Sequence, residues 1–106
     1  MEGATPYLTT QKAWAIATQA KDNQSCADCG VAYRYWVMQL DHIASRGPKA
    51  FTVSATYTTA KDRRAYCTEA QLLAEIAKCE IVCANCHAER THARGGQRWG
   101  RPVVIE

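Results

Sequence analysis

The sequence predicts a small α+β domain, and three features of the 106-residue chain indicate that class. Amphipathic helical patterns run over residues 10–21 and 68–78. Residues 31–40 are rich in aromatic and β-branched side chains, which favour a strand. Cys-x-x-Cys occurs twice, at residues 26–29 and 83–86. Because two such pairs can supply the four thiolates of a tetrahedral ion, we expect a four-cysteine zinc site to staple the domain between flanking helices.

Length and composition support a single stapled domain. A chain of 106 residues buries only roughly 60–65% of its unfolded surface, so an added staple matters. The first seven residues lack the basic start and apolar run of a signal peptide, and no stretch resembles a membrane span. We therefore expect a cytoplasmic location and no membrane partner. In a reducing compartment Cys-x-x-Cys pairs bind metal or do redox chemistry, and the βαβ pattern of a thioredoxin-like protein is missing.

The chain divides into three expected segments. Residues 1–22 hold a helix that packs on the domain, residues 23–93 form the domain with the zinc site, and residues 94–106 form a basic Gly/Arg-rich tail. Thr9 or Thr10 can cap the first helix, which should run to about Lys21, with Trp14 covering a small core. The strand over residues 31–40 should form one arm of a hairpin. Residues 51–57 predict a short strand or an extended loop.

A second helix should begin at Thr68 and run to about Lys78. Thr68-Glu-Ala-Gln71 is a capping-box pattern, in which the threonine and glutamine side chains bond the first free N–H groups. Cys67 and Cys79, at the two ends of this helix, are better explained as small core residues than as ligands. A last short helix should span about residues 85–93. The residues of the second helix expected to face inward are Leu72, Leu73, Ile76 and Ala77.

Three side chains near the cysteines predict a second site. Asp41 and His42 end the expected strand, and His87 directly follows Cys86. A four-cysteine zinc ion is coordinatively closed, so it can position other groups but cannot activate water. Asp41 and His87 offer a carboxylate and an imidazole to a second ion, Mg²⁺ or Mn²⁺, with Ni²⁺ or Co²⁺ as alternatives. Since an imidazole is mostly neutral near pH ~7, His42 could accept a proton from water.

Whether these side chains meet is open at the level of sequence. In strict strand alternation Asp41 and His42 point to opposite faces, so both reach one site only if the strand ends or turns there.

The cysteine pairs, together with Asp41, His42 and His87, resemble the HNH endonuclease family, which has the ββα-metal fold, in its small zinc-stapled phage and bacterial form. The resemblance covers about residues 26–92, and its motifs are Cys26-x-x-Cys29-Gly30, Leu40-Asp41-His42-Ile43, and the run that ends in Cys83-Ala-Asn-Cys86-His87. It implies a divalent-metal-dependent DNA endonuclease. Carried over by position, Asp41 and His87 match the ligands of the catalytic ion and His42 matches the general base. Cys26, Cys29, Cys83 and Cys86 match the structural zinc ligands.

The sequence departs from this family pattern at two positions. Nine residues before the helix histidine, where the family commonly has Asn, this chain has Lys78. That Asn holds the loop behind the catalytic histidine, so the source of loop rigidity is open. Four residues after His87, where the family has another ligand, this chain has Thr91. The next residue, His92, is a candidate metal ligand or phosphate contact.

Basic residues predict contact with the phosphates of DNA. The net charge of +3 is mild, but residues 90–101 carry four arginines and no acid. The candidates for DNA contact are Arg90, Arg94, Arg98 and Arg101 near the last helix, and Lys61, Arg63 and Arg64 on a loop.

Other functions stay open at this level. The main alternative is a non-catalytic zinc-containing module that binds nucleic acid. A zinc domain that binds only protein, and a redox protein, are further alternatives. The sequence does not decide whether the partners of the chain include a second copy, as a homodimer, or a larger phage or restriction machinery.

Overall fold

The computed structural model describes residues 7–58 and 62–95. Within them lie two antiparallel two-stranded sheets, β1–β2 and β3–β4, together with several helices. The expected α+β class is confirmed. The elements in chain order are α1 (Thr10–Lys21), β1 (Gln24–Ser25), β2 (Ala32–Tyr33), β3 (Met38–His42), the 3₁₀ turn η1 (Ala44–Arg46), α2 (Ala55–Thr58), α3 (Glu69–Ile76), β4 (Cys79–Cys83) and α4 (Ala84–Ala93).

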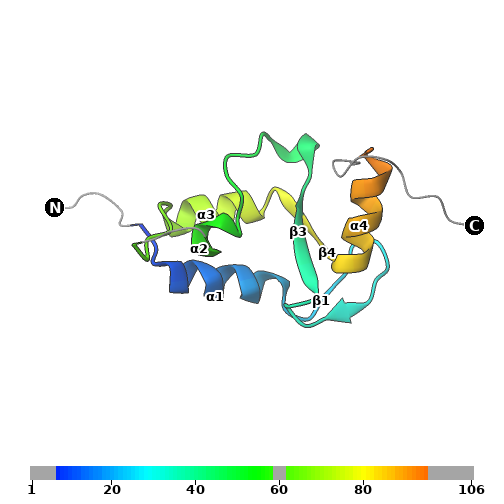
Figure 1. The fold of residues 1–106 in the computed structure, drawn as a ribbon, viewed down its shortest axis with the longest axis horizontal. Coiled ribbons are helices and arrows are strands. Elements are labelled where there is room, and N and C mark those ends of the chain that lie inside the picture. The colour runs from blue at the N-terminus through cyan, green and yellow to red at the C-terminus, as the bar shows by residue number, and fades with distance from the viewer. Residues whose placement is uncertain (1–6, 59–61, 96–106) are drawn as a thin grey trace, which may run out of the picture.

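The β3–β4 sheet lies between two groups of helices. Helices α1, α2 and α3 lie on one side of it and α4 lies on the other (Figure 1). In the ladder Met38 pairs with Cys83 and His42 pairs with Cys79. Because side chains alternate along a strand, β3 presents Leu40 and His42 to the α1–α3 side and Asp41 to α4.

Two apolar clusters hold these layers together. The larger one joins α1, α3 and the segments before and after α2, and the smaller one lies under the cysteines. Leu40 of β3 packs on the first cluster and Met38 of β3 belongs to the second, so one strand connects both. The buried members are Ala13, Ala17, Val53, Ala65, Cys67 and Leu72 in the larger cluster, and Cys26, Met38, Val82 and Cys83 in the smaller one.

The expected helix caps are confirmed. Thr9 caps α1 by accepting a hydrogen bond from the N–H of Lys12 (3.1 Å). Thr68 and Gln71 form both bonds of the capping box at the start of α3. Helix α3 ends at Ile76, two residues before the expected end, because β4 begins at Cys79. No helix within the described residues is long and apolar enough to cross a membrane.

The single strand expected over residues 31–40 is wrong. The chain turns after β2, where the N–H of Val37 donates to the carbonyl of Arg34 (2.9 Å), and β3 then pairs in a different sheet. The carboxylate of Asp22 explains the turn. Its Oδ1 accepts from the N–H of Tyr35 (2.8 Å) and from Nε of Arg34 (2.9 Å), which fastens the turn to the end of α1.

The strand or extended loop expected over residues 51–57 is also wrong in part, because α2 occupies residues 55–58. Hydroxyl groups favour this turn of helix: Oγ1 of Thr56 donates to the carbonyl of Val53 (2.6 Å), and Oγ1 of Thr58 donates to that of Ser54 (2.8 Å).

Two expectations about buried faces need correction as well. On α3, Leu73 is 48% exposed, whereas Leu72 and Glu75 are buried, and Ala77, just after the helix, is exposed. The buried stripe is rotated because the carboxylate of Glu75 finds several donors inside the fold. Trp14 is 43% exposed and packs edge-on against Tyr35 instead of covering the core.

Candidate functional site

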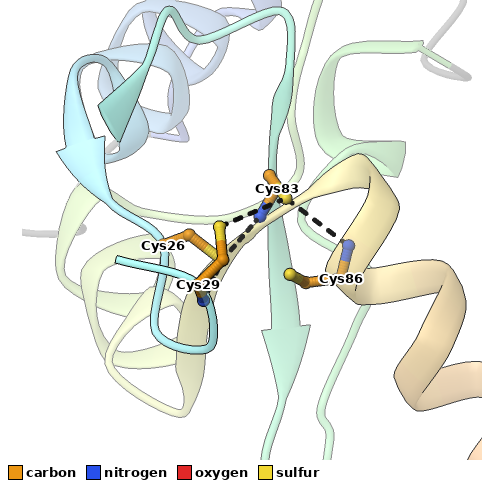
Figure 2. Close-up of side chains that lie close together, drawn as sticks. All are labelled: Cys26, Cys29, Cys83 and Cys86. Atoms are coloured by element: carbon orange, nitrogen blue, oxygen red, sulfur yellow. Dashed lines mark hydrogen bonds between the residues drawn. The ribbon is translucent and has the colours of Figure 1, made fainter. Parts of the chain in front are cut away.

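Four cysteine sulfurs from distant parts of the chain converge at one point (Figure 2). Cys26 and Cys29 lie on the loop after β1, and Cys83 and Cys86 lie where β4 becomes α4. All four sulfurs are within 4.8 Å of one another, and Cys29 and Cys83 are 4.0 Å apart. Sulfurs around a tetrahedral zinc ion, with Zn–S bonds of about 2.3 Å, are about 3.8 Å apart. The four cysteines are therefore positioned to bind a metal ion, as expected, and the donor set is compatible with zinc.

Backbone N–H groups prepare one of these sulfurs, that of Cys26, for negative charge. The sulfur of Cys26 accepts from the N–H groups of Asp28 (3.4 Å), Cys29 (3.5 Å) and Cys83 (3.3 Å). Burial alone would raise the pKa of Cys26, but these hydrogen bonds lower it to about 6. Gly30, at φ +77°, lets the loop turn back behind them. Because a thiolate is the form that binds metal, this loop favours binding before any ion arrives.

The other two cysteines lie apart from this cluster. Cys67 and Cys79 are buried, and the pKa of each thiol is raised by burial, that of Cys79 to about 11. They are core residues, as expected.

A cleft of about 580 Å³ opens beside the β3–β4 sheet. Asp41, His42 and His87, the three residues of the expected second site, all line it. Asp41 and His42 leave β3 on opposite faces, but β3 ends at His42, so both side chains reach the cleft. The remaining lining residues are Lys21, Gln39, Leu40, Lys49, Thr52, Val53, Ser54, Tyr57 and Arg94.

His87 is held by a neighbour on β3. Its Nδ1 is hydrogen-bonded to Oε1 of Gln39, and its Nε2 lies 3.5 Å from Oδ1 of Asp41. The amide oxygen of Gln39 can only accept, so Nδ1 is the donor of this bond, and Nε2 is the ring nitrogen turned toward the carboxylate. A histidine that ligates a metal is usually fixed in this way through its other nitrogen.

Two arginines at the C-terminal end of α4 cover the carboxylate of Asp41. Arg94 donates to both oxygens (2.9 and 2.8 Å), and Arg90 donates to Oδ2 (2.8 Å). Hydrogen bonds from Arg94, together with those from Arg90, outweigh burial and lower the pKa of Asp41 to about 2. Arg90 also donates to Asp28 of the cysteine loop and to Glu80 of β4 (2.7 Å each). Arg90 therefore links the cysteine cluster to the cleft, while Arg94, with a side chain 51% exposed, is the looser partner.

His42 has a carboxylate partner on the opposite side of β3. Its Nε2 lies 2.8 Å from Oε2 of Glu75, a side chain that is only 2% exposed. The same carboxylate accepts from the N–H of Ala50 (3.0 Å) and from Nζ of Lys78 (2.9 Å). Burial alone would raise the pKa of Glu75, but these bonds, that of Lys78 first, lower it to about 2.

Comparisons of the chain with models of protein families, with curated proteins and with solved structures find no match. The chemistry of the side chains in the cleft is therefore what a functional proposal must rest on.

The other predicted contact residues lie in different places. Arg63 and Arg64 are exposed beside the start of α1, where Thr10 donates to the carbonyl of Arg63. The cleft is near Lys21 at the far end of that helix, about 18 Å along its axis. His92 is exposed on α4 and is not among the residues that line the cleft. Lys61, Arg98 and Arg101 lie outside the described residues.

Four residues of the site were not expected from the sequence. Gln39 and Glu75 hold the two histidines, and Lys21 and Lys49 add positive charge to the cleft. Gln39 could have been found, since it lies two residues before Asp41 and so shares its strand face. Glu75 begins the run of residues that resembles the HNH motif but had no role assigned to it, and Lys21 and Lys49 carry no local signal.

Substitution of one cysteine of the cluster should remove the metal and unfold the neighbouring segments. A structural zinc ion contributes about 10–16 kcal/mol in small metal-dependent domains, more than the fold can lose. We expect Cys86→Ala to purify without bound metal and with a lower helix content. Cys67→Ala is the matched control, which should lose only packing and keep one metal ion per chain. Elemental analysis and circular dichroism measure both, and equal metal content in the two variants would contradict this assignment.

Proposed function

We propose that the chain is a divalent-metal-dependent DNA endonuclease of the HNH type, with a ββα-metal core. One observation carries the proposal: Asp41, His42 and His87, the three residues that the HNH motif singles out, line one cleft. An antiparallel pair of strands, one of which carries Asp41-His42 and the other of which leads into the helix that carries His87, also agrees with the order of elements in that fold. The DNA substrate and the activity rest on this resemblance of residues and geometry.

The ion in the four-cysteine cluster is proposed to be zinc in a structural role. Four thiolates fill a tetrahedral shell and leave no position for water or substrate. Its task is then to hold the 26–30 loop against the start of α4, the helix that carries His87 and leads to both covering arginines.

Asp41 and His87 fit a second, divalent cation in chemistry and in spacing. A carboxylate oxygen and a neutral imidazole nitrogen suit Mg²⁺ or Mn²⁺, with Ni²⁺ or Co²⁺ as alternatives. The 3.5 Å between Oδ1 and Nε2 is near the separation of about 3 Å expected for neighbouring ligands of one octahedral ion. When bound, the ion would offset charge on the scissile phosphate and the departing 3′ oxygen. Arg94 now occupies both oxygens of Asp41, so it must release the carboxylate for a cation to bind.

The remaining cleft residues suit a phosphodiester substrate. His42 is proposed to accept the proton of the attacking water through the nitrogen that Glu75 does not hold. Lys21, Lys49 and Arg94 line the cleft together, against one carboxylate, and can attract the phosphate backbone. Arg94 could exchange Asp41 for a phosphate oxygen, since guanidinium groups bind both in the same geometry.

A non-catalytic module that binds nucleic acid is the second candidate. It is favoured by the contacts of Asp41, whose two oxygens are both already bonded to guanidinium groups. In that case the arginines satisfy the buried carboxylate permanently, and the cleft only holds phosphate.

Replacing His42 should abolish cleavage. We expect wild-type protein to cut supercoiled plasmid in the presence of Mg²⁺ or Mn²⁺, and His42→Ala to cut at least about 100-fold more slowly, because a positioned base contributes that much. His92→Ala, a change on the exposed face of α4, is the matched control and should keep most activity. If wild type binds DNA in a salt-dependent way without cutting it under any of Mg²⁺, Mn²⁺, Ni²⁺ or Co²⁺, the binding module is the correct reading.

Removing Arg94 should strengthen cation binding if Asp41 is a metal ligand. A charge-assisted hydrogen bond contributes about 1.5–3 kcal/mol, so Arg94→Met should tighten Mn²⁺ binding about 10-fold or more. Titration of zinc-loaded protein followed by electron paramagnetic resonance of free Mn²⁺ measures this affinity. The double variant Asp41→Asn/Arg94→Met should lose the gain. Equal Mn²⁺ affinity in wild type, the single variant and the double variant would exclude Asp41 as a ligand.

A further inference from the structure

We propose that Glu75 is a positioning residue for His42, which fixes the imidazole as its Nε2–H tautomer and leaves Nδ1 as the nitrogen available in the cleft. The inference rests on the proposed function only in taking His42 as the base. The arrangement itself is a carboxylate–imidazole pair in which His42 lines the cleft and the buried Glu75 lies behind it.

Glu75 is held as firmly as the role requires. Its side chain is buried, and no carboxylate oxygen is without a partner: Oε1 accepts from Lys78, and Oε2 accepts from Ala50 and contacts His42. The ammonium group of Lys78 binds Oε1, the oxygen away from His42, and so compensates the charge of the carboxylate. Oε2 can then accept a hydrogen bond from the histidine. A buried charge that is paired and fully hydrogen-bonded stays in one geometry, which is what an orienting group needs.

The tautomer of His42 follows from this contact. A carboxylate with a lowered pKa carries no proton to donate, so Nε2 of His42 must be the donor across their 2.8 Å contact. The neutral ring then has its lone pair on Nδ1. Nδ1 has no hydrogen bond to any described residue, and His42 lines the cleft. A water molecule in the cleft is therefore the partner that suits this nitrogen.

Glu75 and Lys78 together also restrain the loop behind His42. Nζ of Lys78 donates to the carbonyl of Pro48 (2.8 Å), and the N–H of Ile43 donates to the carbonyl of Lys78 (2.9 Å). Glu75 holds the N–H of Ala50 at the other end of that loop. Lys78, at the position where the related motif has Asn, thus supplies the restraint together with Glu75.

Glu75→Gln removes this arrangement with almost no change in volume. If the amide oxygen faces His42 and Ala50, its NH₂ group faces the ammonium of Lys78. If the amide is reversed, its NH₂ group faces the N–H of Ala50 and forces Nε2 of His42 to accept, which moves the ring proton to Nδ1. Glu69→Gln, the same change at an exposed carboxylate of α3, is the matched control because it leaves the contact of Glu75 with His42 in place.

Long-range ¹⁵N–¹H correlation spectra of the zinc-loaded protein test the inference. At about pH 8.5, where an ordinary histidine is neutral, wild-type His42 should show a bare Nδ1 and a protonated Nε2. The Glu69→Gln variant should show the same pattern, and Glu75→Gln should show the opposite tautomer or a mixture. Plasmid cleavage by Glu75→Gln should fall about 10–100-fold in kcat with little change in KM, the usual effect of losing an orienting group.

The outcomes separate this inference from the proposed function. If wild-type His42 carries its proton on Nδ1, the inference is overturned without any variant and whether or not the protein cuts DNA. If the protein cuts DNA and Glu75→Gln, folded and zinc-loaded, keeps the wild-type tautomer and kcat, Glu75 is only structural. If the tautomers behave as expected and no DNA is cut, the pairing holds and the nuclease proposal fails.

Discussion

The convergence of four cysteine sulfurs is the constraint on which the rest of the structure depends. It joins a loop to the β4–α4 junction across 54 residues of sequence, as the contact of Cys29 with Cys83 shows. Cys83 also pairs with Met38 in the β3–β4 ladder and caps α4. One residue of the cluster therefore fixes the strand that carries Asp41 and the helix that carries His87. Arg90, within the next two turns of α4, repeats the connection by bonding Asp28 beside the cysteines and Asp41 in the cleft.

Two buried carboxylates on opposite sides of β3 lie next to the two histidines of the cleft: Asp41 lines the cleft, and Glu75 of α3 lies behind His42. Asp41 is neutralised by arginines of α4 and its C-terminal cap, and Glu75 by Lys78 of the segment before β4. Each histidine has one nitrogen anchored, His87 to Gln39 and His42 to Glu75. Anchoring one nitrogen leaves the other for a ligand or a proton, so both rings are arranged before any substrate binds. In the proposed nuclease this preorganisation is what allows so small a domain to do chemistry.

The sequence could predict those parts of the molecule that local patterns determine. Each Cys-x-x-Cys pair and each helix cap, at Thr9 and at Thr68, is a pattern of a few neighbouring residues. The structure confirms these predictions. The turn after β2 depends instead on Asp22, about a dozen residues upstream, and no strand propensity reveals it. No local pattern marks Glu75 as a buried residue, and it is buried because Ala50, Lys78 and His42 surround it in space. The motif singles out Asp41, His42 and His87, but that they line one cleft can be seen only in the folded structure.

The measurement that tests the central claim most directly is amide hydrogen exchange of the metal-loaded and the metal-free chain. If the sulfur cluster organises the site, removal of its ion should strip protection from the amides of β3, β4 and α4, whereas the α1–α3 cluster, which lacks the four metal-binding cysteines, should keep more of its own. Equal protection of β3, β4 and α4 in the two states would contradict the account, since the cleft would then be built without the cluster.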